Sequence, residues 1–139
     1  MTSPLSTPGN VVWINGTFDV LHPGHLKLFR YARVLAGPNG KVHLGIDTDV
    51  RVRKAKGPSR PVNSLATRVT NILSIAKIDS IASFATDKEL KSLIRNLKPR
   101  FMVIGDDYRG RDIVGSSCIE EIFYVTRDEH SSTKLIESR

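Results

Sequence analysis

A buried strand that runs directly into a histidine-containing turn constrains this chain more than any other feature of its sequence. The apolar run at residues 11–14 is typical of a strand inside a sheet, and small residues follow it from Gly16 onward. Pro23 then suits the first turn of a helix, where a missing N–H costs nothing. A strand, a tight turn and a helix in this order predict the first unit of a layered α/β fold.

Two histidines, His22 and His25, stand at the predicted start of this helix. Side chains three positions apart on a helix point to the same side, and helix N-termini attract anions. A single histidine in a turn is more often a capping or surface residue, which is the alternative for each one alone. The HxGH spacing favours a phosphate-binding site, which the backbone N–H groups of Gly16, Thr17 and Phe18 help to form.

Strand and helix patterns alternate along the rest of the chain. Strands are expected at residues 11–15, 41–46, 80–84, 101–104 and 122–126, and helices at 22–35, from 64, from an N-cap at Asp87, and from 131 or 132. Such alternation predicts an α/β fold: a single Rossmann-like domain, a five-stranded parallel sheet with helices on both faces. Residues 1–10 are expected to form a flexible N-terminal tail, and residues 11–139 the domain.

The charge of the chain favours anionic partners. Lysine and arginine outnumber aspartate and glutamate by 21 to 14, which gives a net charge of +7. Five cations fall within ten residues of a predicted loop that ends at Asn63: Arg51, Arg53, Lys54, Lys56 and Arg60. No aromatic residue lies among them, so stacking on the bases of a single strand is not favoured. The loop therefore predicts a small polyphosphate ligand, with a nonspecific nucleic-acid patch as the alternative.

Cysteine content and hydropathy indicate the compartment. The single cysteine, Cys118, cannot form an internal disulfide, and no apolar run approaches the roughly 18 residues of a membrane span. The first ten residues have neither the basic start nor the apolar centre of a signal peptide. We therefore expect a cytoplasmic protein without a membrane partner.

Polar segments follow four of the predicted strands. They are the HxGH turn, the basic loop, residues 105–107 and residues 127–133. Because the carboxyl ends of parallel strands lie at one edge of the sheet, where ligands bind near the topological switch point, these segments should meet there. We predict a composite active site at this edge.

The residues at this edge resemble those of the cytidylyltransferase-like nucleotidyltransferases, a family marked by GxFDxxHxGH and a C-terminal SxTxxI-type segment. The similarity covers nearly everything after residue 10. Residues 15–19, 56–63 and 113–116, with Arg68, look like the adenylyltransferase domain of ADP-heptose synthase. Residues 105–108 and 127–133 are more similar to glycerol-3-phosphate cytidylyltransferase. The lysine of the first enzyme's KGGDY pattern is absent here, and His130 and Ser131 replace Gly and Ile of the second enzyme's RTEGISTT pattern.

The resemblance implies a nucleotidyltransferase. It would transfer a nucleoside monophosphate from CTP or ATP to a phosphorylated sugar or polyol, release pyrophosphate and give an NDP-sugar or CDP-polyol. The implied catalytic residues are His22, His25, Lys56 and Arg127. The implied nucleotide-binding residues are Gly16, Thr17, Phe18, Asp107, Ser132 and Thr133, and those for the acceptor or phosphates are Arg68 and Arg60. A homodimer is also implied, and Mg²⁺ is expected with the triphosphate rather than in a metal site of the protein.

Several of these residues have structural alternatives. Arg68 is expected on the polar side of an apolar helix, where a surface salt bridge is the alternative. Lys56 has a solvated loop side chain as its alternative, Asp107 a turn, and Ser132 and Thr133 helix caps. Asp19 is expected to brace the turn before the histidines, and His43 to be structural. For the whole chain, the alternative function is a non-catalytic nucleotide- or nucleic-acid-binding module of the same fold.

Overall fold

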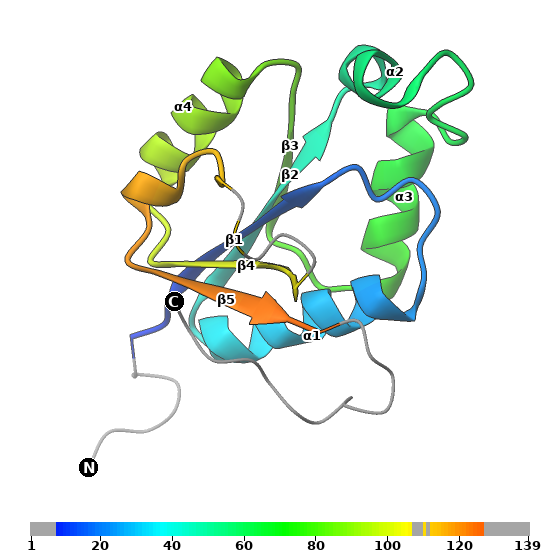
Figure 1. Cartoon of the computed structure of the whole chain (residues 1–139). Coiled ribbons are helices and arrows are strands. Elements are labelled where there is room, and N and C mark those ends of the chain that lie inside the picture. The colour runs from blue at the N-terminus through cyan, green and yellow to red at the C-terminus, as the bar shows by residue number, and fades with distance from the viewer. Residues whose placement is uncertain (1–7, 107–109, 111, 127–139) are drawn as a thin grey trace.

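Five parallel strands form the single sheet of the computed structural model, which describes residues 8–106, 110 and 112–126 (Figure 1). The strands are β1 (Val11–Gly16), β2 (Lys41–Asp47), β3 (Ser80–Phe84), β4 (Phe101–Gly105) and β5 (Glu121–Val125). They lie in the order β3-β2-β1-β4-β5, and every neighbouring pair is parallel. The direction of winding reverses between β1 and β4, so the topological switch point lies at their carboxyl ends.

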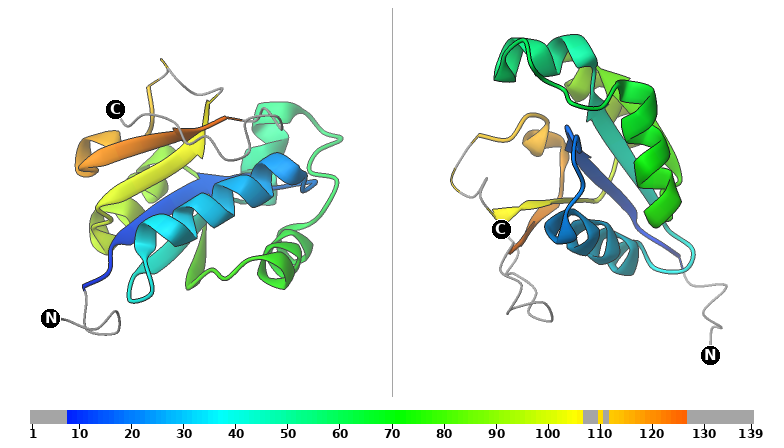
Figure 2. Two further views of the ribbon diagram at one scale, coloured as in Figure 1. Left: turned by 90° about the horizontal axis from the view of Figure 1, so that it is seen from below. Right: turned by 90° about the vertical axis from the view of Figure 1, so that its right-hand side faces the viewer.

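Helices cover both faces of this sheet. They are α1 (Pro23–Ala36), α2 (Asp49–Lys56), α3 (Leu65–Ile75) and α4 (Asp87–Leu97), with a 3₁₀ turn, η3, at Ser116–Cys118. Alternate residues of β1 point to opposite faces: Ile14 packs in the core under α1 and α3, and Trp13 in the core under α4. From below, α1 lies in front of the sheet (Figure 2, left). The predicted α/β, Rossmann-like fold is confirmed.

The prediction that the basic segment is a loop is wrong in one respect, because part of this segment forms α2. Thr48 caps this helix by accepting a hydrogen bond from the Arg51 backbone N–H at 3.3 Å. Only Val52 of its eight residues is buried, so the helix has no apolar stripe that periodicity can detect. The N-cap of α4 is Thr86 rather than Asp87, whose carboxylate lies in the first turn of the helix. The helix expected from residue 131 or 132 lies outside the described residues.

Asn10 marks the point at which the chain joins the sheet. Its amide nitrogen donates to the Leu35 carbonyl at 3.0 Å, and its amide oxygen accepts from Arg100 Nη1 at 3.0 Å. The last residue of the predicted tail is therefore held at the amino end of β1. None of the helices in the described ranges is long and apolar enough to cross a membrane.

Candidate active site

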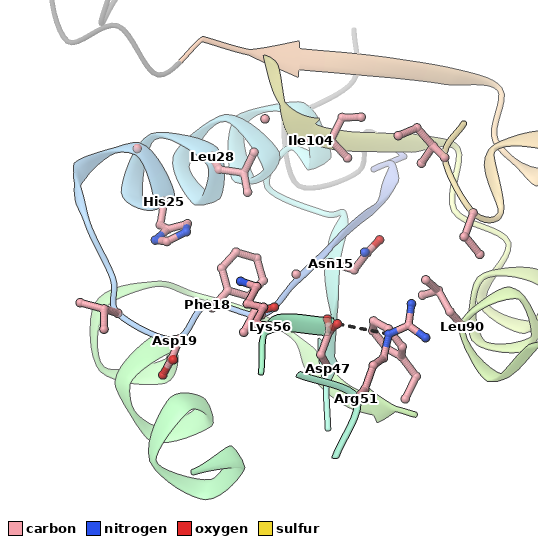
Figure 3. Close-up of a pocket in the computed structure, with 18 of the residues that line it drawn as sticks. Asn15, Phe18, Asp19, His25, Leu28, Asp47, Arg51, Lys56, Leu90 and Ile104 are labelled. Atoms are coloured by element: carbon pink, nitrogen blue, oxygen red, sulfur yellow. Dashed lines mark hydrogen bonds and ion pairs between the residues drawn. The ribbon is translucent and has the colours of Figure 1, made fainter. Parts of the chain in front are cut away.

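A pocket of about 560 Å³ opens at the carboxyl ends of β1, β2 and β4, where the sheet reverses its winding (Figure 3). Its wall begins with the turn at residues 15–20 and the start of α1, and continues over the end of β2, α2 and the residues after β3 and β4. The sequence-predicted residues among its lining are Gly16, Thr17, Phe18, His22, His25, Lys56 and Arg60. The structure thus brings together the HxGH turn and part of the basic segment, as expected from the strand order.

The two histidines form a capping box at the start of α1. His22 is the N-cap, and its Nδ1 accepts a hydrogen bond from the Gly24 backbone N–H at 3.1 Å. In return, His25 Nδ1 accepts from the backbone N–H of His22 at 3.2 Å. The rings stack with their centroids 3.8 Å apart. Capping and ligand binding, which the sequence posed as alternatives, are therefore compatible here.

These hydrogen bonds assign the ring protons. A ring nitrogen that accepts a hydrogen bond carries no proton, so each neutral imidazole holds its proton on Nε2. The backbone thereby orients both rings of His22 and His25 with Nε2–H as the donor. Two ring N–H donors beside the N-terminus of α1 suit an anion in the pocket.

The Phe18 ring packs against His25, one of these two histidines. It meets His25 edge-on, with the centroids 5.3 Å apart (Figure 3). The Phe18 ring also contacts Phe29. The backbone of Phe18 has a φ of 50°, a left-handed conformation that is costly for an aromatic residue. A Cβ on Gly16 would lie 3.2 Å from the Phe18 ring, so a glycine permits this tight turn. Strain concentrated in the turn that faces the pocket fits a functional role.

Asp19 braces the turn, as expected. Its two carboxylate oxygens accept from the backbone N–H groups of Val62 and Asn63 at 2.7 and 2.8 Å. The Asn63 side chain donates to the backbone carbonyl of Asp19 at 2.7 Å. These three bonds fasten the segment that carries Arg60 to the segment that carries the histidines.

Arg68 does not lie on a polar helix surface, and that prediction is wrong: its side chain is fully buried. The guanidinium donates to the backbone carbonyls of Thr17, Asp47 and Asn63 at 2.8–3.1 Å, and to the Asp49 carboxylate at 2.6 Å. Arg68 is absent from the pocket lining. It instead joins the histidine turn, the end of β2, the start of α2 and the loop before α3.

Acidification tests the Asp49–Arg68 ion pair. The hydrogen bond from Arg68 is the largest cause that lowers the pKa of Asp49 below its usual value of 3.8. The folded chain therefore binds this proton more weakly than the unfolded chain, and the stabilisation is complete above the unfolded pKa and lost as pH falls through the folded one. Between about pH 5 and pH 2.5, the Asp49→Asn variant should lose less free energy of unfolding than the wild type, as measured by urea denaturation.

Lys56 and Arg60 border the pocket with exposed side chains. Lys56 is the last residue of α2, and Arg60 lies in the loop that Asp19 fastens. Arg53 and Lys54, on the same helix as Lys56, do not line the pocket. The remaining predicted site residues, Asp107, Arg127, Ser132 and Thr133, lie outside the described residues.

Sequence reasoning missed the end of the pocket that lies beyond Asn15. Asp47 and Arg51 line it and pair through Asp47 Oδ2 and Arg51 Nε at 3.2 Å (Figure 3). Apolar side chains complete this wall: Phe84, Leu90, Ile104, Ile113 and Val114. The position of Asp47 at the carboxyl end of a strand was the available signal. In the sequence, Arg51 stands out only as part of a basic run.

The described residues contain no protein-built metal centre. Within residues 8–106, 110 and 112–126, no group of three or more His, Cys, Asp or Glu side chains is arranged to hold a metal ion. The acidic side chains on the described pocket wall are Asp19, Asp47 and Asp112. Asp19 and Asp47 are already engaged by backbone N–H groups and by Arg51, respectively.

The fold, the switch-point pocket and the HxGH capping box together define the class of this chain. The sequence pattern of the cytidylyltransferase-like family matches residues 13–138, and the chain belongs to this family of nucleotidyltransferases. The resemblance expected from the sequence is confirmed.

Curated relatives agree with this class. The Bifunctional protein HldE of Campylobacter concisus is 36% identical over 129 residues, which cover 93% of this chain and 26% of that protein. The protein of the same name from Paramagnetospirillum magneticum is 38% identical over 110 residues, or 79% of this chain and 22% of that protein. The chain thus spans about a quarter of the length of these relatives.

Solved structures share the fold. The lipopolysaccharide core biosynthesis protein from Thermoplasma volcanium matches with a TM-score of 0.62 at 18% identity, over 78% of this chain and 83% of that one. Pantothenate synthetase from Thermus thermophilus matches with a TM-score of 0.60 at 16% identity, over 94% of this chain and 60% of that one. At these identities the likeness establishes the architecture alone.

Proposed function

We propose that this chain transfers a nucleoside monophosphate from CTP or ATP to a phosphorylated sugar or polyol and releases pyrophosphate. The observation that carries the proposal is the pair of backbone-oriented imidazoles, His22 and His25, at a helix N-terminus beside a pocket with Lys56 on its rim. Hydrogen-bond donors, a helix dipole and a cation together suit a triphosphate. The relatives named Bifunctional protein HldE, and the resemblance to ADP-heptose synthase, support the sugar phosphate as acceptor.

In the proposed reaction, an oxygen of the acceptor phosphate attacks the α-phosphorus of the nucleotide in line with the leaving group. A new P–O bond forms while the bond between the α-phosphorus and the bridging oxygen breaks, and pyrophosphate leaves with that electron pair. Nε2–H of His22 and His25 would donate to the α-phosphate and bridging oxygens as negative charge builds. No covalent enzyme intermediate is needed, because positioning and charge stabilisation carry such transfers.

Other groups complete this scheme. Lys56 and Arg60 would hold the phosphates, and we keep Arg127, Asp107, Ser132 and Thr133 as proposed nucleotide contacts. Mg²⁺ would enter with the triphosphate, whose oxygens and water supply its ligands, and would neutralise charge on the leaving group. For Arg68, the contacts support a role in positioning the turn rather than in touching phosphate.

A cytoplasmic homodimer is part of the proposal, and light scattering of the purified chain tests the dimer.

Pyrophosphate release tests the proposed function. CTP, ATP, UTP and GTP are each combined with a panel of phosphorylated sugars and polyols, with Mg²⁺ present. Release above background with one pair is expected. If nucleotide binds but no pair releases pyrophosphate, the enzymatic proposal fails and the alternative, a non-catalytic nucleotide-binding module, replaces it; binding of oligonucleotides instead would favour the nucleic-acid alternative.

Lys56→Ala should lower kcat/KM for the nucleotide about tenfold, because a cation that contacts phosphate contributes about one charge-assisted hydrogen bond. Steady-state kinetics at fixed saturating acceptor measure this effect. Lys54→Ala is the matched control, since it removes the same charge from the same helix at a position outside the pocket. Equal losses in the two variants would mean that the net charge of α2, rather than a contact of Lys56, attracts the nucleotide.

A further inference from the structure

The two ends of the described pocket carry different kinds of side chains. At one end stand His22, His25 and the N-terminus of α1, with Lys56 and Arg60 on the rim. Asp47, Arg51 and an apolar wall stand at the other end, beyond Asn15 (Figure 3). The first end suits phosphates, so the second is available for a different part of a substrate.

Arg51 is not available as a phosphate ligand, although it lines the second end. Its Nε pairs with Asp47 at 3.2 Å, and its Nη2 pairs with Asp87 Oδ1 at 2.7 Å. The remaining amino group donates to the Ala85 carbonyl at 3.4 Å, and the guanidinium lies 5.0 Å from the centre of the Phe84 ring. Each of the three guanidinium nitrogens of Arg51 thus already donates to a protein oxygen, which disfavours Arg51 as a phosphate ligand.

Asp47 retains hydrogen-bonding capacity toward the pocket. Its Oδ2 accepts from Arg51, while no described residue donates to its Oδ1. Burial is the largest effect on this carboxyl and raises its pKa, against the opposing influence of Arg51. A raised pKa means that folding favours the protonated form, so the ionised carboxylate destabilises the fold above that pKa.

Asn15 supplies the complementary donor. Trp13 Nε1 donates to Asn15 Oδ1 at 2.8 Å, and an indole N–H can only donate, so this bond assigns the amide orientation. The Nδ2 amino group of Asn15 is then available as a donor to a ligand, because Asn15 lines the pocket. An acceptor on Asp47 and a donor on Asn15, beside apolar side chains, match the hydroxyl groups and carbon chain of a sugar or polyol.

We infer that Asp47 and Asn15 form the subsite for the hydroxylated part of the acceptor, with Arg51 as the residue that positions the Asp47 carboxylate. This inference rests on the proposed function for the identity of the acceptor. A hydroxyl group both donates and accepts, and therefore uses both side chains. An ammonium group only donates and would leave the Asn15 amide unpaired, and an anion would be repelled by Asp47.

Asp47→Asn tests the subsite, because it keeps the shape of the side chain and removes its charge. The acceptor KM should rise about tenfold, the loss of one hydrogen bond to a charged group, while the nucleotide KM stays within about twofold. Asp87→Asn is the matched control, since Asp87 also pairs with Arg51 but does not line the pocket. It should leave both KM values unchanged. Arg51→Lys should raise the acceptor KM and spare the nucleotide KM.

Binding measurements separate this inference from the proposed function. By calorimetry, the wild type should bind a phosphorylated sugar or polyol more tightly than inorganic phosphate, and Asp47→Asn should remove that difference without weakening inorganic phosphate. This result supports the subsite even if pyrophosphate release fails. The subsite is wrong if turnover occurs and Asp47→Asn leaves the acceptor KM unchanged, if the nucleotide KM rises instead, or if no panel member binds better than inorganic phosphate.

Discussion

The His22→Asn variant should fold normally and lose about two to three orders of magnitude in kcat, the usual effect of removing one hydrogen-bond donor to developing charge. Asparagine places an acceptor close to the position of Nδ1, so the hydrogen bond from Gly24 and the cap of α1 are retained. It has no counterpart of Nε2–H, which is the proposed donor to the transition state. Single-turnover pyrophosphate release, with saturating nucleotide and acceptor, measures the chemical step directly.

Two further variants separate capping from catalysis. His22→Ala removes the cap as well, and should lose about 1 kcal/mol of unfolding free energy in addition to the loss in kcat. His43→Asn is the control, because His43 lies in β2, pairs with Ser80 and is absent from the pocket wall. If His22→Asn turns over at nearly the wild-type rate, His22 is only a cap and the proposed mechanism must be abandoned.

The central strands could be predicted from the sequence because their middle residues are apolar and buried, whereas β3, at one edge of the sheet, buries only Phe84. A parallel strand covered on both faces is a short apolar run, such as Phe101–Gly105, bounded by polar or small residues. The expected strand at residues 80–84 coincides with β3, and the other four differ from the structure by one residue at one or both ends. The strand order then follows the usual rules for winding, so the edge at which the site lies could also be predicted.

The same reasoning could not find α2, because this helix is stabilised by remote partners. Its Arg51 reaches Asp87 and the Ala85 carbonyl, which lie more than thirty positions further along the chain. No local pattern records such contacts. The apolar-wall end of the pocket was missed for this reason, since Asp47 becomes recognisable as a site residue only when Arg51 and Asn15 are seen beside it.

Arg68 shows the limit of helical periodicity. The pattern of α3 separates apolar from polar positions, and an arginine is then assigned to water. In the structure its acceptors are backbone carbonyls of Thr17, Asp47 and Asn63, which are invisible to any scale of side-chain hydropathy. Buried arginine is rare because its charge must be paired and its N–H groups satisfied, and here both conditions are met.

Arg68→Met should therefore lower the free energy of unfolding by about 3–5 kcal/mol, because a buried acceptor that loses its donor costs about 1–3 kcal/mol and this side chain serves three of them. Methionine fills much of the volume but donates no hydrogen bond. Three backbone carbonyls would lose their donor, and the Asp49 carboxylate would lose its counter-ion. Urea denaturation followed by circular dichroism measures the change, provided that the slope of the transition is unaltered.

Two arginine variants show whether burial is the cause. Arg95→Met removes an exposed arginine from α4 and should change the free energy of unfolding by no more than about 0.5 kcal/mol. Arg68→Lys keeps the charge but lacks the planar fork that serves four acceptors, so its loss should lie between those of the other two variants. A loss of less than 1 kcal/mol in Arg68→Met would show that water or rearranged donors replace the guanidinium. In that case Arg68 would not be the group that joins the histidine turn to β2 and α2.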